Sequence, residues 1–152
     1  MSVLPPSQFP SAVLTMPFTS PENPTLARPL RVLLVDDQAT TRLAIQHLLR
    51  YLLYEADAVA NGREALEVLK KRDYDVVLMD LRMPEMGGLE TTRLLRMLPS
   101  NGHRPRVIAL SADDSPEDRE SCLAVGMDDL VVKPLTRNRL VQALEREAVL
   151  SA

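Results

Sequence analysis

Five short apolar runs alternate with five helix-like segments, and this alternation limits the fold more than any other feature of the chain. The runs occupy residues 31–36, 55–59, 74–80, 106–111 and 129–133, and they read RVLLVD, EADAV, YDVVLMD, RVIALS and DLVVK. Strand and helix in strict alternation are typical of a parallel sheet that is covered by helices on both faces. The apolar character of the runs suits strands that are buried on both sides. We therefore predict an α/β domain over residues 30–150.

Capping residues mark the ends of several predicted helices. Asn61 and Glu64 form a capping-box pattern, while Ser115 directly precedes a proline, Pro116, at a first helical position. Gly126 is expected to end that helix. The other helices are predicted to begin after residue 37, to cover residues 88–98, and to run from residue 136 to about residue 150.

The first 29 residues differ in composition from the rest of the chain. They hold seven of the twelve prolines and both phenylalanines, Phe9 and Phe18, without any helical or strand period. We predict an irregular arm or linker over residues 1–29, extended where proline dictates it. A docking segment that uses Phe9 or Phe18 is the alternative.

Charge and composition exclude several classes of protein. A net charge of −3 and a pI near 5.4 leave no basic footprint for nucleic acid or for an anionic membrane. No apolar run reaches the roughly 18–20 residues that a bilayer-spanning helix needs, and the N-terminus lacks the pattern of a signal peptide. We therefore expect a cytoplasmic location without membrane insertion. The single cysteine, Cys122, excludes an intramolecular disulfide and is expected to be a buried core thiol.

Four of the five predicted strands end in a polar or charged residue. Asp36 and Asp37 follow the first strand, Asp80 ends the third, Ser111 the fourth and Lys133 the fifth. Since the ligand crevice of an open α/β sheet lies outside the carboxyl ends of its strands, these side chains are expected to meet. Carboxylates at close range raise one another's pKa unless a cation compensates them, and an all-oxygen set of ligands suits Mg²⁺. The alternative is that Asp36 or Asp37 only caps the first helix.

The position of Asp80 adds a specific chemistry to this metal site. A carboxylate beside a divalent cation can attack a phosphoryl group and hold it as an aspartyl-phosphate. Ser111 could donate a hydrogen bond to a phosphoryl oxygen, and Lys133 could supply positive charge. Asp80, Ser111 and Lys133 are expected at the same edge of the sheet, which favours this shared chemistry over an unrelated role for each residue.

The motifs VDD, VVLMDLRMPEMGGLE, ALSA and DDLVVKP, in this order, resemble the receiver domain of two-component response regulators. The segments GREALE and CLAVGMDDLVVKPL are most similar in style to the receivers of hybrid histidine kinases. The resemblance covers about residues 31–148. It implies a flavodoxin-like (βα)5 doubly wound parallel sheet with strand order 2-1-3-4-5. It also implies that a histidine kinase or histidine phosphotransfer protein donates phosphate to this domain, which then changes its contacts with a downstream protein target.

The resemblance also implies the residues of the metal site. Asp80 would be the phosphorylated residue. Asp37 would be the direct acidic ligand of Mg²⁺ (or Mn²⁺), supported by Asp36, and the backbone carbonyl of Arg82 would complete the share of ligands that the protein supplies.

Three further residues take roles from the same resemblance. The hydroxyl of Ser111 would move toward the phosphoryl group, and Lys133 would pair with that group. Pro134 would follow a cis peptide bond, which is almost confined to proline.

Three positions depart from the pattern of the family. Leu130 stands where the family often has an aromatic ring that turns inward after phosphorylation, so that an aromatic switch is not available here. Gly87 stands where many relatives have aspartate. Leu53 stands where relatives usually place the C-cap glycine of the first helix.

Arg82 and Asp113 lie two residues after Asp80 and Ser111, respectively. In the family these positions flank the path of the hydrolytic water. We expect the side chains of Arg82 and Asp113 to pair and to slow the loss of the phosphoryl group. Two solvated side chains with little coupling are the alternative.

The leading prediction is a Mg²⁺-dependent switch that accepts phosphate and acts on no metabolite, so that it is not an enzyme in the usual sense. A pseudo-receiver that binds partners without phosphorylation is the alternative. A small Mg²⁺ phosphohydrolase is disfavoured because no cap segment is found, and a dinucleotide site because no G-x-G-x-x-G follows the first strand. No output domain follows residue 150, so we expect either a stand-alone regulator or the receiver of a hybrid kinase. The oligomeric state stays open.

Two histidines are candidates for a phosphate donor, since phosphorelays use histidine. Neither His47 nor His103 has the helical-bundle context of a phospho-donor. Both are expected to have ordinary structural or surface roles.

Overall fold

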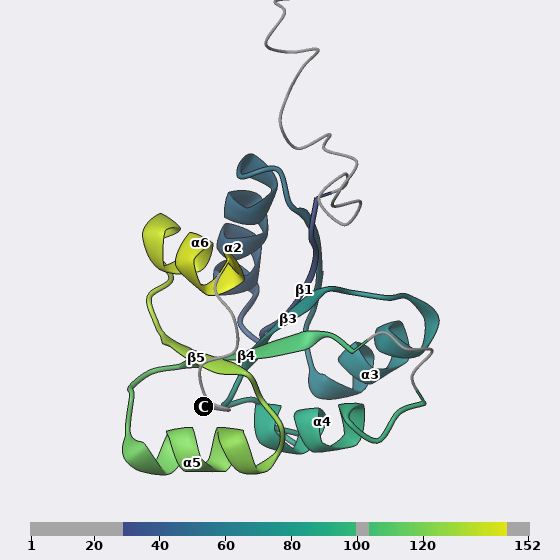
Figure 1. Cartoon of the computed structure of the whole chain (residues 1–152). Helices are drawn as coiled ribbons and strands as arrows, with labels where there is room; N and C mark the ends of the chain where they lie inside the picture. The colour runs from purple at the N-terminus through teal and green to yellow at the C-terminus, as the bar shows by residue number, and fades with distance from the viewer. Residues whose placement is uncertain (1–28, 100–103, 146–152) are drawn as a thin grey trace, which may run out of the picture.

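Each of the five apolar runs forms a strand, and each strand is followed by a helix, in a computed structural model that describes residues 29–99 and 104–145 (Figure 1). The strands are short, as buried parallel strands commonly are. The elements are β1 (Arg31–Val35), α2 (Ala39–Tyr51), β2 (Glu55–Val59), α3 (Gly62–Lys71), β3 (Val76–Asp80), α4 (Gly88–Leu95), β4 (Arg106–Ser111), α5 (Pro116–Ala124), β5 (Asp129–Val132) and α6 (Arg137–Glu145).

All neighbouring strands are parallel, and their order across the sheet is β2-β1-β3-β4-β5. The predicted flavodoxin-like α/β fold and its strand order 2-1-3-4-5 are therefore confirmed. The chain starts in β1, moves outward to β2, and then crosses back to β3 on the other side of β1. This reversal places the carboxyl ends of β1 and β3 at the switch point where α/β folds bind ligands.

Alternate residues of the strands point to opposite faces of the sheet and build two cores. Leu33 and Val77 pack with residues of α3, α4 and α5, whereas Leu34 and Leu78 pack with residues of α2 and α6. Figure 1 shows the same division, with α2 and α6 on one side of the sheet and the other three helices across it. Because both faces are covered, the central strands are apolar throughout and only their ends carry charge.

The predicted caps of α3 and α5 are confirmed. The side chain of Asn61 accepts a hydrogen bond from the backbone N–H of Glu64, and that of Ser115 accepts one from Asp118. After α5, Gly126 adopts a φ of +93°, a conformation that suits glycine.

The predicted length of α4 is wrong by three residues. Its last regular residue is Leu95, not residue 98, because the backbone N–H groups of Met97 and Leu98 bond three residues back, to Leu94 and Leu95. Such bonds tighten the end of a helix into 3₁₀-type turns.

Leu53 occupies the position after the C-cap of α2 and has a φ of +72°. Its N–H bonds to the carbonyl of Arg50, and that of Tyr54 bonds to the carbonyl of Leu49, which is the pattern of a Schellman motif. Glycine adopts this conformation without strain, whereas leucine adopts it at a cost in conformational free energy. The departure from glycine noted in the sequence therefore destabilises the end of α2 locally.

Several expectations fall outside the described residues. These are the arm over residues 1–28, the environment of His103, and the extension of the last helix beyond residue 145. Within residues 29–99 and 104–145, none of the helices has the length and apolar character needed to cross a membrane.

Candidate functional site

The carboxyl ends of β1, β3, β4 and β5 bring the predicted polar residues to one edge of the sheet. Asp36 and Asp37 follow β1, while Asp80 and Ser111 are the last residues of β3 and β4. Lys133 follows β5, and its backbone N–H donates to the carbonyl of Ser111 over 2.7 Å. The sequence order of these residues spans almost 100 positions, and the parallel topology is what makes them neighbours.

Three carboxylates form the core of this edge. One oxygen each from Asp36, Asp37 and Asp80 lies within 4.8 Å of the other two, and no other group of three possible metal ligands is found among the described residues. Asp36 is fully buried and Asp80 is 5% exposed, while Asp37 is half-buried. Oxygen ligands from carboxylates on a compact, partly open edge fit a small divalent cation such as Mg²⁺. The donor set is therefore compatible with the metal that the sequence predicted.

Hydrogen bonds fix Asp36 in the turn after β1. Its side chain accepts from the backbone N–H of Gln38 over 2.9 Å, and its backbone carbonyl accepts from the guanidinium of Arg42 over 2.8 Å. The N-cap of α2 is Gln38, without a side-chain capping bond. The alternative that Asp36 or Asp37 only caps the helix is therefore wrong, because neither carboxylate bonds an N–H of the first helical turn.

Lys133 lies between the two most buried carboxylates. Its ammonium is 3.4 Å from an oxygen of Asp36 and 3.4 Å from an oxygen of Asp80. One cation cannot balance three carboxylates, so the edge keeps an excess of negative charge. Burial raises the pKa of Asp80 above its ordinary value and the charge of Asp36 adds to this, whereas Lys133 and the backbone N–H of Arg82 act in the opposite direction.

Ser111 is buried at the end of β4, and its hydroxyl bonds to residues of the loop and helix that follow. The hydroxyl lies 2.6 Å from the backbone carbonyl of Asp113 and 3.2 Å from a carboxylate oxygen of Asp118. It also accepts from the backbone N–H of Asp113 over 3.2 Å. The strand end is thus tied to the first turn of α5.

The expected pairing of Arg82 with Asp113 is wrong. The guanidinium of Arg82 reaches Asp118 instead, with 3.4 Å to each carboxylate oxygen, while Asp113 is exposed and contributes backbone groups to Ser111. The fixed Ser115 cap turns Asp118 back toward the sheet. In the sequence, Asp118 is simply an acid near the start of a predicted helix. Its spacing from Ser111 gave no signal, because the contact depends on how α5 leaves the loop.

Three other predicted positions lie around this edge. Leu130 is already buried in the core on β5, 3% exposed, so it has no outward position from which to turn inward. The peptide bond between Lys133 and Pro134 is cis, as predicted. Gly87 is the N-cap of α4 and lies against the carbonyl of Leu81, where an added Cβ would be 3.0 Å away.

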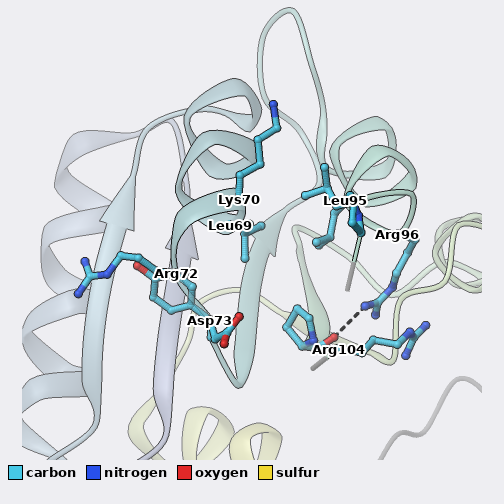
Figure 2. Close-up of a pocket in the computed structure, with 11 residues that line it drawn as sticks. Leu69, Lys70, Arg72, Asp73, Leu95, Arg96 and Arg104 are labelled. Carbon is cyan, nitrogen blue, oxygen red and sulfur yellow. Dashed lines mark hydrogen bonds between the residues drawn. The ribbon is translucent and has the colours of Figure 1, made fainter. Parts of the chain in front are cut away.

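A hollow of about 500 Å³ opens near the amino ends of β3 and β4, whereas the carboxylates lie at the carboxyl ends of the strands (Figure 2). Its lining comes from the end of α3, the loop before β3, the end of α4 and the entry to β4. Figure 2 shows Arg96 bonded to the carbonyl of Pro105 in this lining. The same guanidinium binds the carbonyl of Gly126 and the carboxylate of Asp128, so this cation serves to hold elements together.

The remaining sequence expectations concern His47 and Cys122. His47 is exposed on α2. Cys122 is a buried free thiol, as predicted, and burial raises its pKa to about 11. A thiol with this pKa is inert at neutral pH.

Comparison with known proteins gives one consistent family. The family model described as the response regulator receiver domain matches residues 32–145. Hybrid signal transduction histidine kinase B of Dictyostelium discoideum is 39% identical over 127 residues, which covers 76% of this chain and 6% of that protein. The chain spans 6–15% of the length of this and three other histidine kinases that it matches.

Two solved structures are similar in both sequence and fold. The chemotaxis protein CheY4 of Vibrio cholerae is 34% identical with a TM-score of 0.74, and the match covers 78% of this chain and 98% of that chain. The receiver domain of a sensor histidine kinase of Pseudomonas aeruginosa PAO1 is 36% identical with a TM-score of 0.71, over 82% of this chain and 99% of that chain. That structure contains a magnesium ion coordinated in its active site cleft.

Proposed function

Since the chain belongs to the response regulator receiver domain family of two-component and phosphorelay systems, we propose that it accepts a phosphoryl group on Asp80 from a phosphohistidine partner. An oxygen of the Asp80 carboxylate attacks phosphorus, an O–P bond forms, and the N–P bond of the phosphohistidine breaks. The imidazole of the donor leaves with the electron pair of that bond. The product is an aspartyl-phosphate at the end of β3.

Asp80 is placed for attack by the elements around it. It ends the central strand β3, and two backbone hydrogen bonds hold the chain that follows it. The N–H of Leu81 donates to the carbonyl of Leu110, and the N–H of Arg82 donates to the Asp80 side chain. The carboxylate is 5% exposed at the open edge of the sheet. A rigid, partly desolvated carboxylate loses little freedom in reaching the phosphoryl group.

The carboxylates of Asp36, Asp37 and Asp80 would hold Mg²⁺ or Mn²⁺, with Asp37 as the most accessible of the three and the backbone carbonyl of Arg82 as a further ligand. A divalent cation held by these residues would supply positive charge that lowers the repulsion between the carboxylate and the phosphoryl group. The fully buried Asp36 is held in place because its carboxylate accepts a hydrogen bond from the backbone N–H of Gln38.

Lys133 and Ser111 would bind the transferred phosphoryl group. The ammonium of Lys133 already lies 3.4 Å from an oxygen of Asp80 and can follow the added negative charge. The hydroxyl of Ser111 would leave its present acceptors and donate to a phosphoryl oxygen. The displacement of Ser111 would change the conformation of the β4–α5 loop. The surface formed by this loop is the one that a downstream protein would recognise.

In this proposal the domain is a signalling switch that catalyses only its own phosphorylation and dephosphorylation. Its partners are a histidine kinase or a histidine phosphotransfer protein and a downstream protein target. The histidine kinases among its relatives support this placement, without naming the donor or the signal. We expect a cytoplasmic location, where such donors would meet it.

The observation that carries the proposal is the position of the Lys133 ammonium at equal distance from Asp36 and Asp80, in a cluster that holds a third carboxylate. The test is incubation with acetyl phosphate and Mg²⁺, followed by intact mass spectrometry. We expect an adduct of one phosphoryl group that disappears in Asp80→Asn and in the presence of a metal chelator. An unmodified protein at saturating donor would refute the proposal and would support the pseudo-receiver, which the buried Leu130 favours because it replaces the aromatic switch.

Arg82 is expected to tune the lifetime of the phosphoryl group, but not by pairing with Asp113. We expect Arg82→Ala to shorten the half-life of the adduct, since the long side chain two residues from the acceptor would no longer limit the access of water to it. The half-life is measured by the decay of the adduct after the donor is removed, and an unchanged half-life would show that Arg82 has no such role.

A further inference from the structure

Asp118 lies at the third position of α5, in the first turn of that helix. Its backbone N–H donates to the side chain of the N-cap residue Ser115 over 3.1 Å. This bond fixes the residue at the start of the helix, and its side chain is only 17% exposed. The carboxylate is therefore held against the end of the sheet and is not a solvated acid of a helix terminus.

The carboxylate of Asp118 contacts two side chains that flank the phosphorylation site. One oxygen lies 3.2 Å from the hydroxyl of Ser111, and both oxygens lie 3.4 Å from the guanidinium of Arg82. Ser111 is the last residue of β4. Arg82 is two residues from Asp80 and donates its backbone N–H to that side chain over 3.3 Å. One acid on α5 therefore connects the strand end of β4 with the loop after β3.

Both contacts compete with a phosphoryl group on Asp80. The hydroxyl of Ser111 has a single proton, and its two acceptors are the carbonyl of Asp113 at 2.6 Å and the carboxylate of Asp118 at 3.2 Å. Neither acceptor is on Asp80, so the hydroxyl must break these contacts before it can donate to a phosphoryl oxygen. The guanidinium of Arg82 could approach a phosphoryl group on Asp80 only if it first left Asp118. The carbonyl of Asp113 is the nearer acceptor of the Ser111 proton, and the carboxylate of Asp118 adds a charged acceptor, a kind that holds a donor more strongly than a neutral one.

We propose that Asp118 is a positioning residue that holds Ser111 and Arg82 in the unphosphorylated arrangement and releases both when Asp80 carries a phosphoryl group. This inference rests on the proposed function. Asp118 is not one of the three clustered carboxylates, and its side chain contacts Ser111 and Arg82. It acts through Ser111 and Arg82. Part of the binding free energy of a phosphoryl group is spent on breaking their contacts with Asp118, so these contacts lower the apparent affinity of the site.

The test uses beryllium fluoride, a stable analogue of the phosphoryl group, titrated into the full chain with saturating Mg²⁺ and followed by nuclear magnetic resonance. We expect Asp118→Asn to tighten the apparent affinity by about three- to tenfold, the effect of one hydrogen bond. Asp114→Asn is the matched control, because Asp114 is an acid of the same loop that pairs with Arg119 instead. We expect it to change the affinity by less than about twofold, as an exposed ion pair does.

A double-mutant cycle separates release of Ser111 and Arg82 from simple loss of negative charge. In the background of Ser111→Ala and Arg82→Ala together, Asp118→Asn has no donor to release, so we expect its gain to fall to the level of the Asp114 control. An equal gain in both backgrounds, or an equal gain from Asp114→Asn, would overturn the proposal. Asp118→Ala, checked for folding by circular dichroism, repeats the cycle with a shorter side chain.

The outcomes distinguish this inference from the proposed function. Binding of beryllium fluoride by the wild-type protein, lost in Asp80→Asn, supports the function whatever Asp118 does. Wild-type binding with an unaltered affinity in Asp118→Asn contradicts only the role of Asp118. No binding by the wild-type protein contradicts both.

Discussion

Gly88 is the first residue of α4, and the space around it ties the helix to the phosphorylation site. A Cβ at this position would clash with the backbone carbonyl oxygen of Asp80, and it would lie 2.9 Å from the side chain of Met79 and 3.0 Å from the backbone of Leu81. Two of these three atoms belong to the backbone of the strand end and cannot move aside alone. We therefore predict that Gly88→Ala displaces the loop between β3 and α4, and Asp80 with it.

The magnitude follows from two opposing terms. Alanine favours a helical conformation over glycine by about 0.5–1 kcal/mol, whereas forcing a methyl group into a packed region costs about 1–3 kcal/mol. The steric term is larger here because the contact with the Asp80 carbonyl is far below a normal van der Waals separation. We expect a net loss of about 1–2 kcal/mol, which corresponds to a melting temperature lower by roughly 3–10 °C for a domain of this size.

The assay is thermal unfolding followed by circular dichroism, together with calorimetric titration of Mg²⁺. We expect Gly88→Ala to lower both the melting temperature and the Mg²⁺ affinity. Gly87→Ala is the control, since its Cβ would lie 3.0 Å from the carbonyl of Leu81 and at an ordinary contact distance of 4.0 Å from that of Met83, and we expect a smaller change. The reasoning fails if Gly88→Ala melts and binds Mg²⁺ like the wild-type protein, or if both variants behave alike.

Three further predictions concern stability. Leu53→Gly removes a strained φ of +72° from a side chain that is 80% exposed, and we expect about 0.5 kcal/mol of stabilisation in urea unfolding; destabilisation would show that Leu53 makes a needed contact. Arg96→Met removes the 2.9 Å partner of the buried Asp128 carboxylate and leaves it only the exposed Arg104 at 3.9 Å, and we expect a loss of about 3 kcal/mol in the same assay; a change near zero would contradict this. Burial and the hydrogen bond to Asp57 raise the pKa of Tyr74 from 10.0 to about 12, so the folded state holds this proton more tightly than the unfolded state. Stability should therefore fall by up to about 3 kcal/mol as the pH rises from about 10 to about 12, and absorbance titration of the phenol with an ordinary midpoint would contradict the shift.

The sequence predicted the fold because its signals are local and redundant. Five apolar runs, the Asn61 and Ser115 caps and the stop at Gly126 each indicate the same alternation of elements, and each is found in the structure. Once the alternation is known, the topology of a parallel sheet requires the strand ends to meet. The approach of Asp36, Asp37 and Asp80 thus followed from the positions of charges at the ends of apolar runs.

Other parts of the site could not be predicted, because they depend on side-chain reach across loops. The partner of Arg82 is Asp118 and not Asp113, since the direction of α5 turns Asp118 inward. The contact of Arg42 with the carbonyl of Asp36 has no sequence signature either, because a basic residue on the exposed face of a helix is common. The close approach at Gly88 is likewise invisible in a motif that reads MGGLE.

The central claim, phosphorylation of Asp80, is tested most directly by locating the modified residue. The protein is treated with acetyl phosphate and Mg²⁺ and then reduced with sodium borohydride, which converts an aspartyl-phosphate to homoserine. Peptide mass spectrometry then identifies the position. We predict homoserine at position 80 alone, and none when the metal is chelated. Modification at another residue, or none at position 80 despite saturating donor and Mg²⁺, would contradict the assignment.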